Sequence, residues 1–265
     1  MSSFTDQTGR KIKLQKAPKR IISLVPSQTE LLVDLGLKEN LIGITKFCVH
    51  PENLRSEKEI VGGTKQVSYK QIEELKPDII LGNKEENTRK MVGELEKIAP
   101  VHLSDVDSVE GAIDLIEIYG ELFQVVEKAG EIKNKILKQR KKFGKACLNK
   151  AEKPLKIAYF IWRKPWMVAA SGTFIDAMIQ EQGWENAFAD LERYPPVKLA
   201  DLPDCDRILL SSEPFPFKEK HREEIKAYFD ADKIHFVDGE YFSWYGSRLS
   251  LAYPYFKILH DKITQ

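Results

Sequence analysis

The sequence predicts an α/β protein with two lobes joined by a single long α-helix. Short apolar strands alternate with amphipathic helices early in the chain, no strand candidate occurs from residue 108 to about residue 148, and the alternation then resumes. We therefore expect an N-terminal α/β lobe at residues 1–107, a linking helical segment with the long helix at 108–150, and a C-terminal α/β lobe at 151–265. A length of 265 residues suits two lobes of ordinary size.

The first lobe opens with an apolar strand at 21–25, and the next strand is expected at 41–45. Between them, Ser27 and Glu30 have the spacing of a helix capping box, and Gly36 follows the apolar run where a helix ends. A second capping box begins at Ser68, before a helix expected at 69–75. The other elements expected here are a helix at 85–98 and strands at 78–82 and 101–103.

The linking segment shows helical spacing of apolar residues throughout. We expect a bend near Gly120 and then one helix of roughly 20 residues, about 30 Å long at 1.5 Å per residue. The densest basic run of the chain, Lys138 to Lys145, lies in this helix. Such a run is ordinarily a solvated helix face.

The second lobe repeats the alternation after a polar break at 149–154. Thr173 has the position of a helix N-cap, and Gly183 that of the closing glycine. The elements expected here are strands at 155–161, 166–170, 207–211 and 234–237, and helices at 173–183, 219–229 and from about 248 to the end.

Composition excludes several classes of protein. A net charge of +1 gives the chain as a whole no electrostatic drive toward nucleic acid or an anionic membrane. The first residues contain no apolar signal-peptide segment, and no run reaches the roughly 18 apolar residues of a membrane span. We expect a cytoplasmic location for the chain as it stands, or a missing precursor segment. Three scattered cysteines, Cys48, Cys147 and Cys205, predict small buried thiols and no disulfide framework.

The motifs of common enzymes are absent from the sequence. It contains no phosphate-binding G-x-x-x-x-G-K-[ST] loop, no G-x-G-x-x-G, no HExxH and no G-x-S-x-G. The five histidines share no helical spacing that would form a metal site. The sequence therefore favours a binding protein over an enzyme, with no catalytic residue, intrinsic cofactor or resident metal.

Aromatic residues follow several of the predicted strands, in loops. In open α/β sheets, ligands collect outside the carboxyl ends of the strands, and large aromatics there suit a flat or apolar ligand. Charged residues among them could contact ligand carboxylates or phosphates. The candidate ligand-binding residues are Phe47, Lys84, Glu85, Trp162, Arg163, Trp166, Tyr194, Trp244 and Tyr245.

Four segments carry a family resemblance: KRIISLVPSQTELLVDLGL, LIGITKFCVHP, VGGTKQVSYKQIEELKPDIILGNKEEN and ASGTFIDAMIQEQGWENAF. Together they resemble the substrate-binding proteins of ABC importers for cobalamin and ferric siderophores, the helical-backbone metal receptors or class III periplasmic binding proteins. The resemblance runs from about residue 19 to the C-terminus. It implies two Rossmann-like lobes joined by a single long α-helix.

The resemblance also implies a function. We expect a monomeric solute-binding protein that captures a cobalamin-like corrinoid or a ferric siderophore in an inter-lobe cleft for ABC-type uptake, in the periplasm or anchored to a membrane. Glu73 and Asp201 lie near the positions where the family carries its importer-docking carboxylates. At about Thr64 and Asn83 the chain departs from the cobalamin binders, which carry tryptophans there.

Two other functions remain open at this point. The absent export signal favours a cytosolic enzyme or chaperone of corrinoid or metal-chelate metabolism on the same scaffold. A weaker alternative is direct binding of a bare metal ion through His50, Glu85 or Glu86, and His260.

Overall fold

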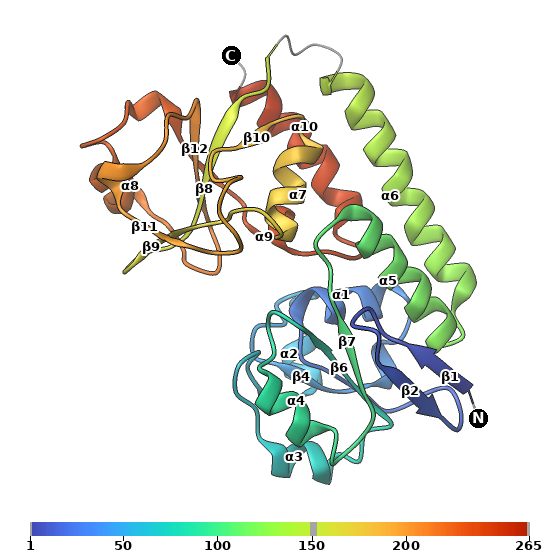
Figure 1. Cartoon of the computed structure of the whole chain (residues 1–265). Coiled ribbons are helices and arrows are strands. Elements are labelled where there is room, and N and C mark those ends of the chain that lie inside the picture. The colour runs from blue at the N-terminus through green and yellow to red at the C-terminus, as the bar shows by residue number, and fades with distance from the viewer. Residues whose placement is uncertain (1, 149–152, 264–265) are drawn as a thin grey trace. The chain divides into compact units, whose positions relative to one another are not determined.

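The computed structural model describes residues 2–148 and 153–263, and these form two compact units. Unit 1 contains the described residues up to 106 together with 110–136 and 245–248, and unit 2 contains 107–109, 137–148, 153–244 and 249–263. The predicted lobe boundary at residues 150 and 151 lies outside the described residues. Each unit has its own sheet and its own core, as the α/β alternation of the sequence predicts (Figure 1).

The main sheet of unit 1 has the strand order β5-β4-β3-β6-β7, and all of its strands are parallel. The order reverses between β3 and β6, which is where open α/β sheets usually place a ligand. Its strands are β3 (Ile21–Ser23), β4 (Leu41–Thr45), β5 (Glu59–Gly62), β6 (Ile79–Asn83) and β7 (Val101–Ser104). The sequence predicted four of these strands and missed β5.

The helices of unit 1 connect these parallel strands. They are α1 (Pro26–Asp34), α2 (Leu54–Glu57), α3 (Tyr69–Glu74) and α4 (Arg89–Leu95). Ser68 caps α3 as predicted, because its hydroxyl accepts from the Gln71 amide at 3.3 Å. Gly36 ends α1 with φ 83°, a left-handed conformation that glycine adopts without strain.

Two predicted helix starts in unit 1 are wrong. Proline at the first position starts α1 at Pro26, so Ser27 lies inside the helix, and the N-cap residue Val25 makes no side-chain capping bond. The helix expected from residue 85 begins four residues later, at Arg89, with Thr88 as its N-cap. The Asn83 side chain accepts from the amides of residues 85 and 86 and holds them in a turn.

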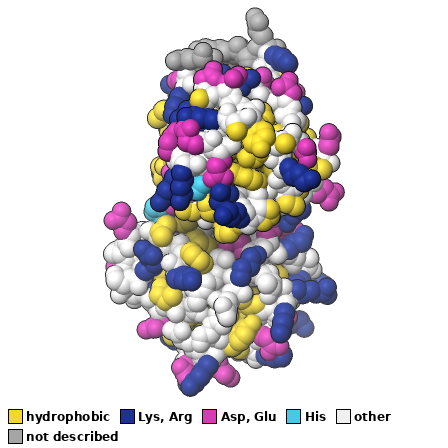
Figure 2. All heavy atoms as spheres, turned by 90° about the vertical axis from the view of Figure 1, so that its left-hand side faces the viewer, with side chains coloured by type: hydrophobic (Ala, Val, Ile, Leu, Met, Phe, Trp, Pro, Cys, Tyr) yellow, Lys and Arg dark blue, Asp and Glu magenta, His cyan; other side chains and the backbone are white. Residues whose placement is uncertain are grey.

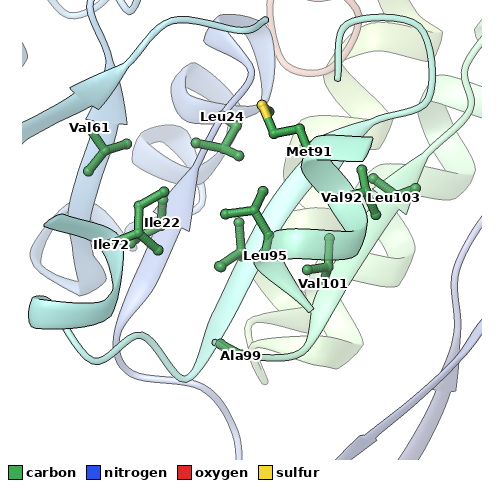
Figure 3. Close-up of a cluster of buried hydrophobic side chains, with 11 residues drawn as sticks. Ile22, Leu24, Val61, Ile72, Met91, Val92, Leu95, Ala99, Val101 and Leu103 are labelled. Carbon is green, nitrogen blue, oxygen red and sulfur yellow. The ribbon is translucent and has the colours of Figure 1, made fainter. Parts of the chain in front are cut away.

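The core of unit 1 fills the space between the sheet and its helices. Ile22 of the central strand β3 and Leu24, which directly follows it, pack in one cluster with residues from α3 and α4 (Figure 3). Ile72 of α3 and Leu95 of α4 are almost completely buried. Burying these side chains is the main favourable contribution to the stability of the unit.

A two-stranded antiparallel hairpin, β1 (Ser2–Thr5) and β2 (Lys11–Leu14), precedes the sheet and was not predicted. Its turn depends on the buried Asp6, whose carboxylate accepts from the amides of Thr8 and Arg10. The same carboxylate accepts from the amide of Leu103 and so ties the hairpin to β7. Burial raises the pKa of Asp6, but these hydrogen bonds outweigh it and lower the pKa overall.

The linking segment consists of α5 (Val109–Leu122) and α6 (Val126–Cys147). α6 is continuous over 22 residues and runs from unit 1 into unit 2, which confirms the predicted long helix (Figure 1). The bend predicted near Gly120 lies four residues later, at Gln124, which has φ 59°. Gly120 instead allows close helix packing: a Cβ there would lie 2.7 Å from the Ala129 Cβ.

The sheet of unit 2 has the order β11-β9-β8-β12-β13, with β10 also pairing with β8. β10 and β12 pair parallel with β8, β13 pairs parallel with β12, and β9 pairs antiparallel with both of its neighbours, β8 and β11. Its strands are β8 (Lys156–Trp162), β9 (Trp166–Val168), β10 (Glu185–Asn186), β11 (Pro196–Val197), β12 (Arg207–Ser211) and β13 (Ile234–Val237). The four longer strands were predicted.

The helices of unit 2 are α7 (Phe174–Glu181), α8 (Glu219–Ile225), α9 (Glu240–Ser243) and α10 (Leu249–Ile263). Thr173 caps α7 as predicted by accepting from the Asp176 amide at 3.1 Å. The three cysteines are buried thiols outside any disulfide, which confirms that prediction. Among the described residues, no helix has both the length and the apolar composition needed to cross a membrane.

The packing of unit 2 gives a first prediction. Leu210 of β12 is fully buried in its core, whereas Leu251 of α10 is 47% exposed. We expect Leu210→Ala to lower the free energy of unfolding by about 2–5 kcal/mol, because it removes buried methyl groups and leaves a cavity. Leu251→Ala is the matched control and should cost less than about 1 kcal/mol. Urea unfolding followed by circular dichroism measures both, and equal losses would contradict this assignment of the core.

Candidate functional site

The candidate site in unit 1 lies at the carboxyl ends of its parallel strands. Phe47 follows β4, and half of its surface is exposed. Its ring lies over Gly63, since a Cβ on Gly63 would approach the Phe47 Cε2 atom to 3.1 Å. The Lys46 ammonium is 5.1 Å from the centre of the same ring. The edge therefore presents an open aromatic surface beside a cation.

Lys84 and Glu85 follow β6 at the same edge. The exposed Lys84 pairs with Asp105, which follows β7, at 2.5 Å. Glu85 is half-buried in the turn that Asn83 holds, and its carbonyl accepts from Lys65 at 2.5 Å. Asn87 closes the turn, because its side chain accepts from the Asn83 amide at 2.8 Å and donates to the Thr64 carbonyl at 2.7 Å.

A buried hydrogen-bond network fills the place where the strand order of unit 1 reverses. The Gln28 side-chain amide donates to Ser104 Oγ at 2.6 Å, to Tyr245 Oη at 3.0 Å and to the Gly82 carbonyl at 3.3 Å. Its oxygen accepts from the Tyr119 hydroxyl at 2.6 Å. Burial raises the pKa of both tyrosines, so they stay protonated donors. The hydroxyl of Tyr245 is thus used inside unit 1.

A buried ion pair holds the same chain segment in unit 1. Arg248 donates to both carboxylate oxygens of Glu30 at 2.8 and 2.7 Å, and both side chains are nearly buried. Burial raises the pKa of Glu30, and pairing with Arg248 opposes that rise. Arg248 is therefore already bound by a carboxylate of this chain.

The candidate site in unit 2 is an aromatic cluster at the ends of β8 and β12. Trp162 is 39% exposed and meets Phe215 edge to face, with ring centres 5.6 Å apart. Trp166 stacks on Phe217 with ring centres 5.7 Å apart and planes 7° apart. Phe215 joins the two pairs, since its ring centre lies 4.9 Å from that of Phe217. Trp162 is the open end of this cluster, and Trp166 is half-buried within it.

Basic side chains accompany this cluster. Arg163 lies over the Trp166 ring, 5.7 Å from its centre, and donates two hydrogen bonds to one carboxylate oxygen of Glu224 at 2.9 and 2.7 Å. Its guanidinium is thereby oriented before any ligand arrives. Figure 2 shows hydrophobic and basic side chains gathered side by side on one face of unit 2.

Trp244 is buried beneath the strand ends of unit 2. Its indole nitrogen donates to Glu213 Oε1 at 2.9 Å, and only 6% of the residue is exposed. Ser243 donates to the same carboxylate oxygen. Burial raises the pKa of Glu213, and the two donated hydrogen bonds oppose the rise.

The remaining predicted residues lie on loops or surfaces. Tyr194 is half-buried before β11. Glu73 is exposed on α3, and Asp201 is exposed in the short 3₁₀ helix Leu199–Asp201. His260 stacks on Trp184, with ring centres 5.1 Å apart. In the described part of the chain, no three His, Cys, Asp or Glu side chains come together as a metal site would require.

Sequence reasoning missed several residues of these two edges. Gln28 and Tyr119 were not singled out because they lie in segments predicted to be helical, and Ser104 because it is a small polar residue directly after the strand predicted at 101–103. Phe215 and Glu213 were not predicted as site residues either. The segment that holds them, SEPFPF, directly follows β12 and has the same pattern of aromatics after a strand that identified Phe47. Applied to β12, that pattern would have found Phe215.

Comparisons with known proteins identify the family of this chain. The sequence profile described as "Periplasmic binding protein" matches residues 21–209. The chain belongs to the periplasmic binding protein family. This confirms the resemblance found in the sequence, and the α/β fold with two lobes and a connecting helix is confirmed by solved structures of the family.

Curated relatives of this periplasmic binding protein are distant. A vitamin B12-binding protein of Vibrio campbellii is 28% identical over 188 residues, which cover 69% of this chain and 66% of the relative. An uncharacterized ABC transporter substrate-binding lipoprotein of Bacillus subtilis is 25% identical over 134 residues, 49% of this chain and 42% of the relative. The matches therefore span less than two thirds of each of these relatives.

Solved structures share the fold over almost the whole chain. A possible iron-binding periplasmic solute-binding protein of Staphylococcus epidermidis has a TM-score of 0.76 at 24% identity and covers 94% of this chain and 100% of its own. The periplasmic vitamin B12-binding protein of Vibrio cholerae has a TM-score of 0.75 at 20% identity, and the match covers 94% of this chain and 99% of that protein. A heme-binding protein has a TM-score of 0.79 at 17% identity, covering 97% of this chain and 89% of its own.

The buried carboxyl group of Glu213 gives a second prediction. Because its folded pKa is raised above the ordinary 4.5, its contribution to stability is complete below that value and is lost as the pH rises through the folded pKa. Glu213→Gln keeps an acceptor for Trp244 and carries no charge. We expect the variant to lose less stability than the wild type between about pH 4 and about pH 8, measured by urea unfolding.

Glu192→Gln is the control for this experiment. Glu192 is an exposed carboxylate of the same unit. Its neutralisation should leave the pH dependence of the wild type unchanged. If both variants follow the wild-type pH curve, Glu213 does not have the raised pKa that its burial implies.

Proposed function

We propose that this chain is a substrate-binding protein that captures a metal chelate, a cobalt corrinoid or a ferric chelate, and delivers it to an ABC importer. The observation that carries the proposal is the pair of exposed aromatics, Phe47 in unit 1 and Trp162 in unit 2, each at the carboxyl end of a parallel strand. Relatives named for vitamin B12, and solved structures named for heme and iron, support this class of ligand.

The edges favour a large, partly apolar ligand that carries negative groups. Flat rings bury much area against aromatic faces and are oriented by a few polar contacts. Lys46 beside Phe47 and Arg163 beside the Trp162 cluster are suited to carboxylates or phosphates on such a ligand. We propose Phe47, Lys84, Glu85, Trp162, Arg163, Trp166 and Tyr194 as contact residues.

Trp244 and Tyr245 have a different proposed role. Both are buried and hydrogen-bonded within their own units. They support the edges from behind, and we expect their substitution to act on ligand binding through stability. Thr64 and Asn83 also belong to the framework, because both hold the turn after β6.

No specific observation favours an enzyme or a chaperone of chelate metabolism. The relatives are named as binding proteins or as a substrate-binding lipoprotein. The two candidate edges are lined by aromatic and basic side chains, which bind a ligand without covalent chemistry. We therefore propose a carrier that acts where its family does, in the periplasm or attached to a membrane as a lipoprotein.

The chelate assignment gives a third prediction. Purified protein is titrated with cyanocobalamin, heme and a ferric hydroxamate siderophore, and tryptophan fluorescence is followed. We expect one of these to bind and quench. Phe47→Ala and Trp162→Ala should each weaken its Kd by about tenfold or more, because each removes an aromatic anchor.

Tyr228→Ala is the matched control, since Tyr228 is a 54% exposed aromatic that follows α8. It should leave Kd unchanged. If no chelate of the panel binds the wild type, the proposed ligand class is wrong. If Tyr228→Ala weakens binding as much as Trp162→Ala does, the aromatic edge is not the site.

The importer partner gives a fourth prediction. Glu73→Lys combined with Asp201→Lys should leave chelate affinity unchanged and lower uptake at least about tenfold in cells that carry the importer, because it reverses the charge of two docking contacts. Glu52→Lys with Asp261→Lys places the same change on exposed acids elsewhere in the two units. Equal uptake by both double variants would remove Glu73 and Asp201 as docking residues.

A further inference from the structure

The second half of α6 carries a one-sided array of lysines that the proposed function does not use. We call it the basic stripe, and it consists of Lys138, Lys141, Lys142 and Lys145. At 3.6 residues per turn, the four side chains leave the helix within an arc of about 100°. All four are exposed. The buried residues Phe143 and Cys147 leave on the other side, about 170° away.

The stripe is electrostatically unbalanced. Two neighbouring cations of α6 are paired: Lys133 with Glu117 at 2.5 Å, and Arg140 with Glu181. Within residues 2–148 and 153–263, no lysine of the stripe has an ion pair. The reason lies in the sequence, because the chain has no acidic residue from 132 to 151. A chain of net charge +1 thus concentrates unpaired positive charge on one helix face.

Ordinary stabilising roles do not account for the stripe. A cation near a helix C-terminus interacts favourably with the macrodipole, but that effect falls off within the last turn and applies to Lys145 alone. Lysines placed within 5–6 Å of each other on one helix face repel, so the array costs stability. Leu137 and Leu148, 37% and 42% exposed, lie along one edge of the stripe. The face therefore combines positive charge with an apolar border.

We propose that the basic stripe is a docking surface for an anionic lipid membrane. Four lysines on one helix face form a sequence-readable contact for acidic headgroups, and each adds to the attraction near the surface. The bordering leucines can enter the headgroup boundary, as apolar residues of interfacial helices do. Four exposed lysines on one helix face suit a flat array of negative charges.

Protein and nucleic acid partners fit the same face less well. Protein interfaces are enriched in arginine and aromatic anchors and depleted in lysine, and the stripe contains lysine alone among its charged groups. Single-stranded nucleic acids also need aromatic stacking platforms, and the stripe has none. Lysine, a strongly hydrated point charge, is suited to diffuse attraction without fixed geometry.

Vesicle sedimentation tests the proposal. The purified full chain is mixed with vesicles of phosphatidylcholine alone or of equal parts phosphatidylglycerol and phosphatidylcholine. We expect binding to the anionic vesicles only, and its loss in about 0.5 M salt, where the screening length is about 4 Å. The variant Lys138→Gln, Lys141→Gln, Lys142→Gln, Lys145→Gln should bind at least about a hundredfold more weakly, since each lysine contributes about fivefold.

The control removes four exposed lysines elsewhere in the chain, and its net charge therefore changes by the same amount: Lys11→Gln, Lys13→Gln, Lys16→Gln and Lys90→Gln. It should bind as the wild type does. The proposal is overturned if the wild type ignores anionic vesicles, if the stripe variant binds unchanged, or if the control loses binding equally. It is also overturned if the wild type binds soluble polyglutamate through the stripe but not vesicles, which would identify an acidic protein as the partner. Circular dichroism of both variants establishes that they are folded. The vesicle experiment needs no chelate, so its outcome is independent of the proposed ligand.

Discussion

The buried side chain of Gln28 is the constraint on which unit 1 depends most. Gln28 of α1 lies where the strand order of the parallel sheet reverses, beside the carboxyl ends of β6 and β7. Gln28 satisfies the Gly82 carbonyl there and joins Ser104, Tyr119 and Tyr245 in one closed network. A fully satisfied buried network of this kind favours one arrangement of its members. The network thereby ties the ends of β6 and β7 to α1.

Unit 2 supports its edge with a buried carboxylate. Glu213 accepts from Trp244 and Ser243, and its backbone amide donates to Ser211 Oγ at 3.2 Å, next to the end of β12. These contacts fix the loop that leads to Phe215 and so the ring that meets Trp162. In both units, a polar framework behind the strand ends leaves one aromatic open at the surface. The two edges thus use different chemistry for the same purpose.

Local sequence signals predicted most elements, and their failures have local causes. The β4 limits at 41–45 and the cap at Thr173 were predicted correctly because periodicity and capping act over a few residues. The capping box at Ser27 was wrong because Pro26 starts the helix before it. The hairpin β1–β2 forms its turn through local bonds of Asp6, but it is tied to the rest of unit 1 by Asp6 and Leu103, a partner 97 residues away. Propensity carries no information about such a distant bond.

By itself, the sequence determined the α/β class, the long helix and the family. It also placed aromatic residues after the strands, where a ligand site is expected. Each of these depends on residue order or on motifs along the chain. Only the tertiary structure decided which aromatics are open, because exposure depends on what packs against a ring from far away. Trp162 ends β8 and Trp244 comes after β13 of the same sheet, yet Glu213 binds Trp244 in the interior. The structure also revealed that the lysines of α6 face one way without partners, since the pairing of charges is decided in space.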